Sequence, residues 1–235
     1  MSENDDFIAR LCSAEVPHSQ RRRHIIEAEA TQFTEEEIAT LRPTLRDFVV
    51  EFRDSADRMD QTAVASAIRK YVATLPLDEL PSAAFLLEAG ERSSPPIGVE
   101  LEVAKMVVRK LTANVAEGQY RAPELADRLF EIADTYLSDR LLSREKHGAI
   151  ALNAVLGLAL LQSDHFAECL HEIQSLRSRW FIDHLALRAR EIMAEISSQF
   201  PEPRIAGQFA NLSQIAALPN IPSHEGVPNA GSTAR

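Results

Sequence analysis

Apolar side chains recur at intervals of three to four positions along most of this chain. One such stripe consists of Leu45, Phe48, Val49, Phe52 and Ala56. This spacing is typical of an α-helix that buries one face. No segment alternates apolar and polar residues as a β-strand does, and no Asn-Gly or Asp-Gly pair indicates a hairpin turn. The pattern therefore predicts an all-α protein.

Polar residues and prolines divide the stripes into separate helices. Thr34 followed by Glu37 forms a capping box, which predicts the start of a helix. Asp60 is the expected N-cap of the next helix, and Pro76 ends that helix. Pro123 is expected in the first turn of a later helix, where proline is well tolerated. These boundaries predict successive helices joined by short connections.

The segment from Ser143 to about Leu161 is apolar on nearly every face. A helix of this kind is usually central in a fold, because it must be covered on all sides. Gly148 and Gly157 lie inside it, where each glycine costs about 1 kcal/mol relative to alanine. We expect a neighbouring helix to approach closely at these glycines and so to offset that cost.

Composition divides the chain into three regions. Residues 1–33 are predicted to form short helices that are partly packed, and residues 34–198 are predicted to form a helical core domain. Residues 199–235 are rich in proline and end in small polar residues, so we expect a largely disordered tail. Within this tail, the segment from Ile205 to Leu218 is apolar enough to form one short helix that docks on the core.

A weak repeat connects the predicted helices of the core. The segment Ala84–Glu88 lies about 43 residues before Arg128–Glu131, which lies about 42 residues before Leu170–Ile173. Each segment is followed by a second apolar helix. A period in the low forties with two helices per unit resembles HEAT and armadillo repeats over roughly residues 60–198, as an architectural likeness without a diagnostic motif. The resemblance implies a short α-solenoid of antiparallel helix pairs. A globular helical bundle is the alternative.

Composition and charge narrow the functional classes. The chain has 235 residues, of which 45% are hydrophobic and 26% are charged, and these values are typical of a globular protein rather than a disordered one. Its formal net charge is −10. Because phosphate contacts supply most of the affinity for nucleic acid, this balance speaks against a free nucleic-acid-binding protein.

The sequence gives no sign of export or of membrane insertion. The N-terminal segment is acidic where a secretory signal would be basic. The longest apolar run, from Ala149 to Leu161, is shorter than the roughly 20 residues that a bilayer span needs. The two cysteines, Cys12 and Cys169, do not make a disulfide framework. We therefore expect a cytoplasmic protein with reduced thiols and no membrane contact.

One group of residues has metal-ligand chemistry at helical spacing. His165, Glu168, Cys169 and Glu172 would lie on one side of a helix, and imidazole, thiolate and carboxylate all bind zinc. The alternative is that Cys169 is a small core residue and that the glutamates face solvent. The chain also lacks a P-loop, a G-x-G-x-x-G loop and a G-x-S-x-G elbow. We favour the alternative and predict no metal, no cofactor and no catalytic residue.

A basic cluster near the N-terminus is a further candidate site. Arg21, Arg22 and Arg23 lie between His18 and His24. The cluster could meet phosphate or an acidic partner, or it could be a solvated helix face that nearby glutamates balance. We favour the solvated face.

Basic residues later in the chain supply the candidate contacts with a partner. Arginines flank Trp180, and arginine and tryptophan together are enriched in protein interfaces, although Trp180 could instead pack in a turn between two helices. In a solenoid the second helices of the pairs line one face, so their polar positions become candidates as well. We therefore predict partner contacts at Lys105, Arg109, Arg177, Trp180 and Arg188.

These observations favour a protein-interaction module, such as an adaptor, a regulator or a subunit of a complex, whose partner is a protein or a peptide. A metal-assisted helical-bundle enzyme is one alternative. It would need two Glu-x-x-His pairs on separate helices; Glu168-x-x-His171 has this spacing, and the required second copy on another predicted helix is missing. A nucleic-acid-associated helical protein is the other alternative, and its binding would weaken steeply as salt rises.

Overall fold

A computed structural model describes residues 3–13, 15–87, 96–115, 122–199 and 206–220. Within these ranges every regular element is a helix and there is no strand. The all-α prediction is therefore confirmed for the described chain. None of its helices is long and apolar enough to cross a bilayer.

The helices follow one another closely along the chain. In order, they are α1 (Glu3–Cys12), α2 (His18–Ala30), α3 (Glu35–Phe52), α4 (Arg58–Thr74), the 3₁₀ helix η1 (Leu77–Leu87), α5 (Ile97–Ala113), α6 (Pro123–Tyr136), α7 (Asp139–Leu142), α8 (Glu145–Leu160), α9 (His165–Ser175), α10 (Arg179–Gln199), α11 (Ala206–Ala217) and the short 3₁₀ helix η4 (Leu218–Asn220). The 3₁₀ helix η1 contains Pro81.

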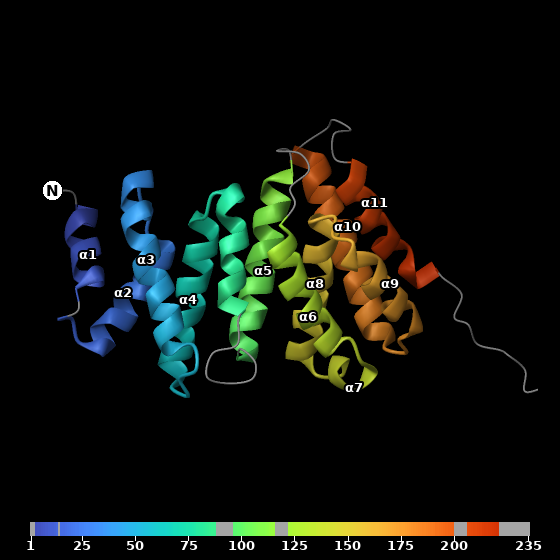
Figure 1. Cartoon of the computed structure of the whole chain (residues 1–235), viewed down its shortest axis with the longest axis horizontal. Helices are drawn as coiled ribbons and strands as arrows, with labels where there is room; N and C mark the ends of the chain where they lie inside the picture. The colour runs from blue at the N-terminus through green and yellow to red at the C-terminus, as the bar shows by residue number, and fades with distance from the viewer. Residues whose placement is uncertain (1–2, 14, 88–95, 116–121, 200–205, 221–235) are drawn as a thin grey trace, which may run out of the picture.

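The helices are packed in pairs and stacked in chain order. α1 packs on α2, α3 on α4, η1 on α5, and α6 on α8. The second helices of these pairs form a continuous layer, because α2 contacts α4, α4 contacts α5, and α5 contacts α8. Figure 1 shows the helices side by side along the long axis, from α1 at one end to α11 at the other. This stacking is compatible with a helical-repeat architecture.

Hydrogen bonds between neighbouring pairs recur at a nearly constant sequence separation. The side chains of Arg22, Arg69, Lys70, Lys110 and His165 bond to groups 38, 40, 39, 37 and 38 residues away. Each pair therefore adds somewhat fewer than the 42 to 43 residues that the sequence comparison of the first helices indicated.

One hydrophobic core runs through the whole stack, from Leu11 in α1 to Leu218 in η4. The helix α8 is central, because it contacts α5, α6, α7, α9, α10 and α11. A Cβ atom at Gly157 would lie 2.8 Å from Leu129 Cδ1, and one at Gly148 would lie 2.9 Å from the ring of Trp180. The expected close approach at both glycines is therefore confirmed.

Local signals fixed some helix starts and misplaced others. The capping box is present, since Glu37 N donates to Thr34 Oγ1 at 3.3 Å and Thr34 N donates to a Glu37 carboxylate oxygen at 2.7 Å. Pro123 is the first residue of α6. The predicted N-cap at Asp60 is wrong, because Asp57 accepts the backbone N–H bonds that start α4.

The two terminal regions both contribute helices to the stack. Ile25 and Ala28 of α2 are fully buried in the common core. The helix α11 lies in the segment where we expected a short docking helix, and it packs on α8 and α10 with Leu212 and Ile215 buried. The predicted disorder of residues 221–235 concerns a segment outside the described residues.

Candidate functional site: a basic groove between α4 and α5

The helices α4 and α5 carry similar short sequences at equivalent positions. Ile68–Thr74 reads IRKYVAT, and Val108–Asn114, 40 positions later, reads VRKLTAN. The two helices are neighbours in the second layer. Equivalent positions therefore hold an arginine followed by a lysine in successive units of the stack. The sequence contains this signal, although the repeat inferred from the first helices did not reveal it.

A groove of about 400 Å³ lies between these two segments. Its lining combines basic, apolar and small polar side chains, with a single acid from α2. The lining residues are Glu29, Arg69, Lys70, Ala73, Thr74, Met106, Arg109, Lys110, Ala113 and Asn114. The protein as a whole carries a net charge of −10, so the groove is a local concentration of positive charge on an acidic protein.

The two lysines of the groove bind carbonyl groups at the ends of helices. Lys70 Nζ donates to the carbonyl oxygen of Thr31, the C-cap of α2, at 2.6 Å. Lys110 Nζ donates to the carbonyl oxygen of Ala73 in the last turn of α4 at 2.9 Å. Cations are favourable at helix C-termini, where carbonyl groups lack intrahelical partners. Burial lowers the pKa of Lys70, although Glu29 opposes that shift. Both lysines thus join successive helices of the layer.

Arg69 is held by two carboxylates. Its Nε and one terminal nitrogen donate to the two oxygens of Glu29 at 2.7 Å and 2.8 Å, and its other terminal nitrogen donates to Glu102 at 3.1 Å. Arg69 and Glu29 therefore form a bidentate ion pair between a guanidinium and a carboxylate. The hydrogen bond from Arg69 lowers the pKa of Glu29, and the same bond raises the pKa of Arg69.

Arg109 occupies the equivalent position on α5 and is exposed. It has no hydrogen bond or ion pair with any residue that the structure describes. Lys105 lies one turn earlier on the same face of α5, at 3.7 Å from Glu102. The apolar side chains of Met106 and Ala113 lie beside these cations in the helix. The groove therefore offers cationic groups next to an apolar surface.

The predicted contact residues lie on two separate parts of the stack. Arg109 lines the groove and Lys105 lies one turn earlier on α5, outside the lining, while the other three lie at or near α10. Arg188 pairs with Glu191 within α10 at 2.8 Å, and Arg177 is exposed just before that helix. Trp180 is 46% exposed, and its ring lies over Gly148 and 4.5 Å from the ring of His184.

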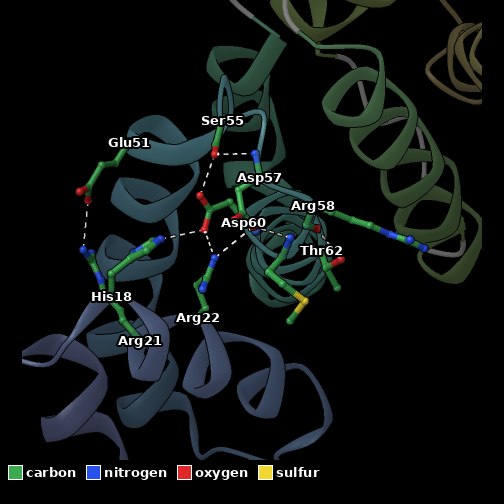
Figure 2. A network of polar contacts seen from close by, with 10 residues as sticks. His18, Arg21, Arg22, Glu51, Ser55, Asp57, Arg58, Asp60 and Thr62 are labelled. Carbon is green, nitrogen blue, oxygen red and sulfur yellow. Dashed lines mark hydrogen bonds and ion pairs between the residues drawn. The ribbon is translucent and has the colours of Figure 1, made fainter.

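The basic cluster of α2 makes ion pairs within the protein. Arg22 bonds to Asp60 at 3.0 Å and His18 Nε2 bonds to the same oxygen at 2.7 Å, as Figure 2 shows. Arg21 bonds to Glu51 of α3 at 3.0 Å. These three side chains therefore attach α2 to α3 and α4. The interpretation as a solvated helix face fits Arg23, which is exposed, better than its two neighbours.

Asp60 has a counterpart 40 positions later in Glu100, and both acids are buried near the start of a helix. Burial alone would raise the pKa of Asp60, but hydrogen bonds from Ser55, His18 and Arg22 outweigh it and hold that pKa below its ordinary value. Glu100 accepts one hydrogen bond, from the hydroxyl of Tyr136 at 2.6 Å. Burial therefore dominates there and raises the pKa of Glu100.

Two of the residues with metal-ligand chemistry on α9, His165 and Cys169, have roles within the fold. His165 Nε2 bonds to Asp127 at 3.0 Å, and its ring stacks on Phe130. Cys169 is fully buried, and burial together with the charges of nearby acids raises the pKa of its thiol to about 12. The thiol therefore keeps its proton at neutral pH, as a small core residue would. Among the described residues no three His, Cys, Asp or Glu side chains are placed to hold a metal ion.

No protein-family model, curated protein or solved structure matches this chain. The groove itself is therefore the basis for inferring a function.

Proposed function

We propose that this protein is a protein-interaction module with a HEAT- or armadillo-like stack of helix pairs, and that it holds a segment of its partner in the groove between α4 and α5. In this proposal the protein is an adaptor, a regulator or a subunit of a complex, and it is not an enzyme. The observation that carries the proposal is the groove of about 400 Å³, in which cationic and apolar side chains lie together on the second helices of the stack.

The architecture supports binding of a chain rather than of a small metabolite. Stacked helix pairs present extended surfaces that suit peptides and proteins. The groove lies in such a surface, and its lining combines basic residues with Ala73, Met106 and Ala113. Arginine beside apolar surface is typical of the residues that contribute most to protein interfaces.

The charge of the protein supports a protein partner over nucleic acid. The net charge is −10, and two of the three arginines in the α2 cluster bond to acids in α3 and α4. A nucleic acid would require several phosphate contacts along a basic stripe. The groove offers a short basic surface, which fits a segment of a partner protein.

Purification of the tagged chain from its native host, at native expression and after mild crosslinking, tests this proposal. The informative variant is R109E, because Arg109 is exposed and its replacement should leave the fold intact. R140E is the matched control, since Arg140 is an exposed arginine of α7 outside the groove lining and the charge change is the same. We expect partners that wild type and R140E retain and R109E loses. Recovery of wild type always alone, or the same partners on R109E, would contradict the proposal.

A further inference from the structure

We infer that Arg109 binds a carboxylate of the partner in the same bidentate geometry in which Arg69 binds Glu29. The ligand of the groove is therefore an acidic peptide segment. This inference rests on the proposed function, because it names the chemistry of the segment that the groove would hold. It follows from a comparison of two equivalent positions within the same chain.

The first of these positions shows a complete pair. Arg69 of α4 faces α2, the preceding second helix, and α2 supplies Glu29 from 40 positions earlier in the sequence. The two bonds of 2.7 Å and 2.8 Å join both oxygens of the carboxylate to the guanidinium. A planar guanidinium matches a carboxylate in this way better than an ammonium group does. The protein thus contains its own example of what such an arginine binds.

The second position lacks the acid. Arg109 of α5 faces α4, the preceding second helix, and the residue of α4 one repeat before Arg109 is Arg69. The chain therefore places an arginine where the first position has a glutamate. Among the described residues Arg109 makes no ion pair. A carboxylate from another molecule would complete at Arg109 the arrangement that Glu29 completes at Arg69.

The surroundings of Arg109 favour a negatively charged group. Lys105 and Lys110 lie on the same helix, and Lys110 also lines the groove. The two acids in this region, Glu29 and Glu102, are both bonded to Arg69. Cations therefore exceed acids around the groove, and an entering carboxylate meets net positive charge. Attraction of this kind raises association rates and selects for partners of opposite charge.

The apolar part of the groove indicates that the ligand also carries an apolar side chain. Ala73, Met106 and Ala113 lie in the lining beside the cations. An acidic residue next to an apolar one would therefore use both surfaces. A polyanion with many phosphates fits less well, because the remainder of the protein is strongly acidic and repels it.

A selection experiment with random peptides tests this chemistry directly. Phage that display random dodecapeptides are selected on immobilised full-length protein, and the selected peptides are then tested on wild type, R109E and R140E. We expect the peptides that need Arg109 to be enriched in Asp or Glu next to apolar residues. Their dissociation constants should rise about tenfold on R109E and stay unchanged on R140E. Replacing the acid of a selected peptide by its amide, and raising the salt concentration, should each weaken binding as well.

A second variant removes the site without changing the net charge. The double substitution E29R/R69E reverses the pair between α2 and α4, removes the bond from Arg69 to Glu102, and places a carboxylate of this chain next to Arg109. We expect this internal acid to compete with the peptide and to weaken binding about tenfold, while thermal unfolding shows that the helical stack is retained. A variant that is folded and binds the acidic peptides as wild type does would contradict the inference.

The outcomes separate this inference from the proposed function. Peptides that need Arg109 but show no excess of Asp or Glu would overturn the carboxylate chemistry. Single-stranded oligonucleotides would overturn it as well if they bound more tightly than the peptides and if this binding required Arg109. If host partners still depend on Arg109 in that case, the proposed function stands while the inference fails. If acidic peptides need Arg109 but host partners do not, the carboxylate chemistry stands and the proposed function fails.

Discussion

The second layer contains two successive junctions, α2 with α4 and α4 with α5. The later helix of each junction has charged residues at equivalent positions, but the partners of these residues differ. Each later helix has a buried acid near its start and an Arg-Lys pair near its end. At the α2–α4 junction, the preceding helix provides an opposite charge for both Asp60 and Arg69. At the α4–α5 junction, Glu100 meets a tyrosine of α6, and Arg109 meets no acid in the described structure.

The two junctions show that the apolar and the polar positions of this repeat depend on different requirements. Apolar positions build the same helix pair at both junctions, because the core needs only shape and hydrophobicity. The polar positions depend on what the preceding unit presents. The same residue type is therefore an internal connection at one junction and an exposed charge at the next.

The greatest loss of stability is expected from a substitution at Asp60. Replacement by asparagine, D60N, leaves Arg22 and His18 without their shared carboxylate, and we expect a loss of about 2 kcal/mol in the free energy of unfolding at neutral pH. Because the folded protein lowers the pKa of Asp60, its contribution is present above the ordinary aspartate pKa and is lost as the pH falls through the folded value. Denaturant unfolding should therefore show a difference between wild type and D60N that disappears in acid. A constant difference would contradict the charge network.

The equivalent substitution at Glu100 should have the opposite sign. E100Q keeps an acceptor for the Tyr136 hydroxyl and removes a buried charge, so we expect a gain on the order of 1 kcal/mol at neutral pH. The folded protein raises the pKa of Glu100, so wild type is favoured below the ordinary glutamate pKa and loses that stability as the pH rises through the folded value. The two unfolding curves should converge in acid. A variant less stable than wild type at neutral pH would show that Glu100 has a charged partner.

Smaller changes in stability distinguish the two arginines. We expect R69A to cost about 1 kcal/mol, because it leaves Glu29 and Glu102 without their shared cation on a partly exposed surface. R109A should change the free energy of unfolding by less than about 0.5 kcal/mol, since the side chain is exposed and makes no described ion pair. Both values come from the same denaturant titration. Equal losses would mean that Arg109 also has a structural role.

Several features of the fold follow from the sequence because they depend on neighbours along the chain. Thr34 and Glu37 identify a helix start, since both hydrogen bonds of the capping box join residues three positions apart. The apolar stripes identify the buried faces, because the period of the helix fixes which side chains share a face. The two glycines of α8 indicate a close approach, although the sequence does not name Leu129 and Trp180 as the groups that approach.

Other features depend on residues about forty positions apart and were decided by the tertiary structure. Asp60 was predicted to cap α4, but Asp57 is the cap, and Asp60 instead bonds to His18 and Arg22 of α2, which lie 42 and 38 positions earlier (Figure 2). The short helix α7 was not predicted, since four residues carry no periodic signal.

The pairing of charges in the groove also depends on residues about forty positions apart. The two arginines of the groove lie in similar sequence contexts, so the chain alone indicated that both lie near the C-terminal end of a helix and outside its buried stripe. Whether each arginine meets a carboxylate depends on the residue that the preceding helix brings beside it, Glu29 in one case and Arg69 in the other. Local periodicity therefore determined the helices and their buried sides. The stacking of the helices determined which charged side chains are paired, because ion pairs depend on distance in space rather than on spacing along the chain.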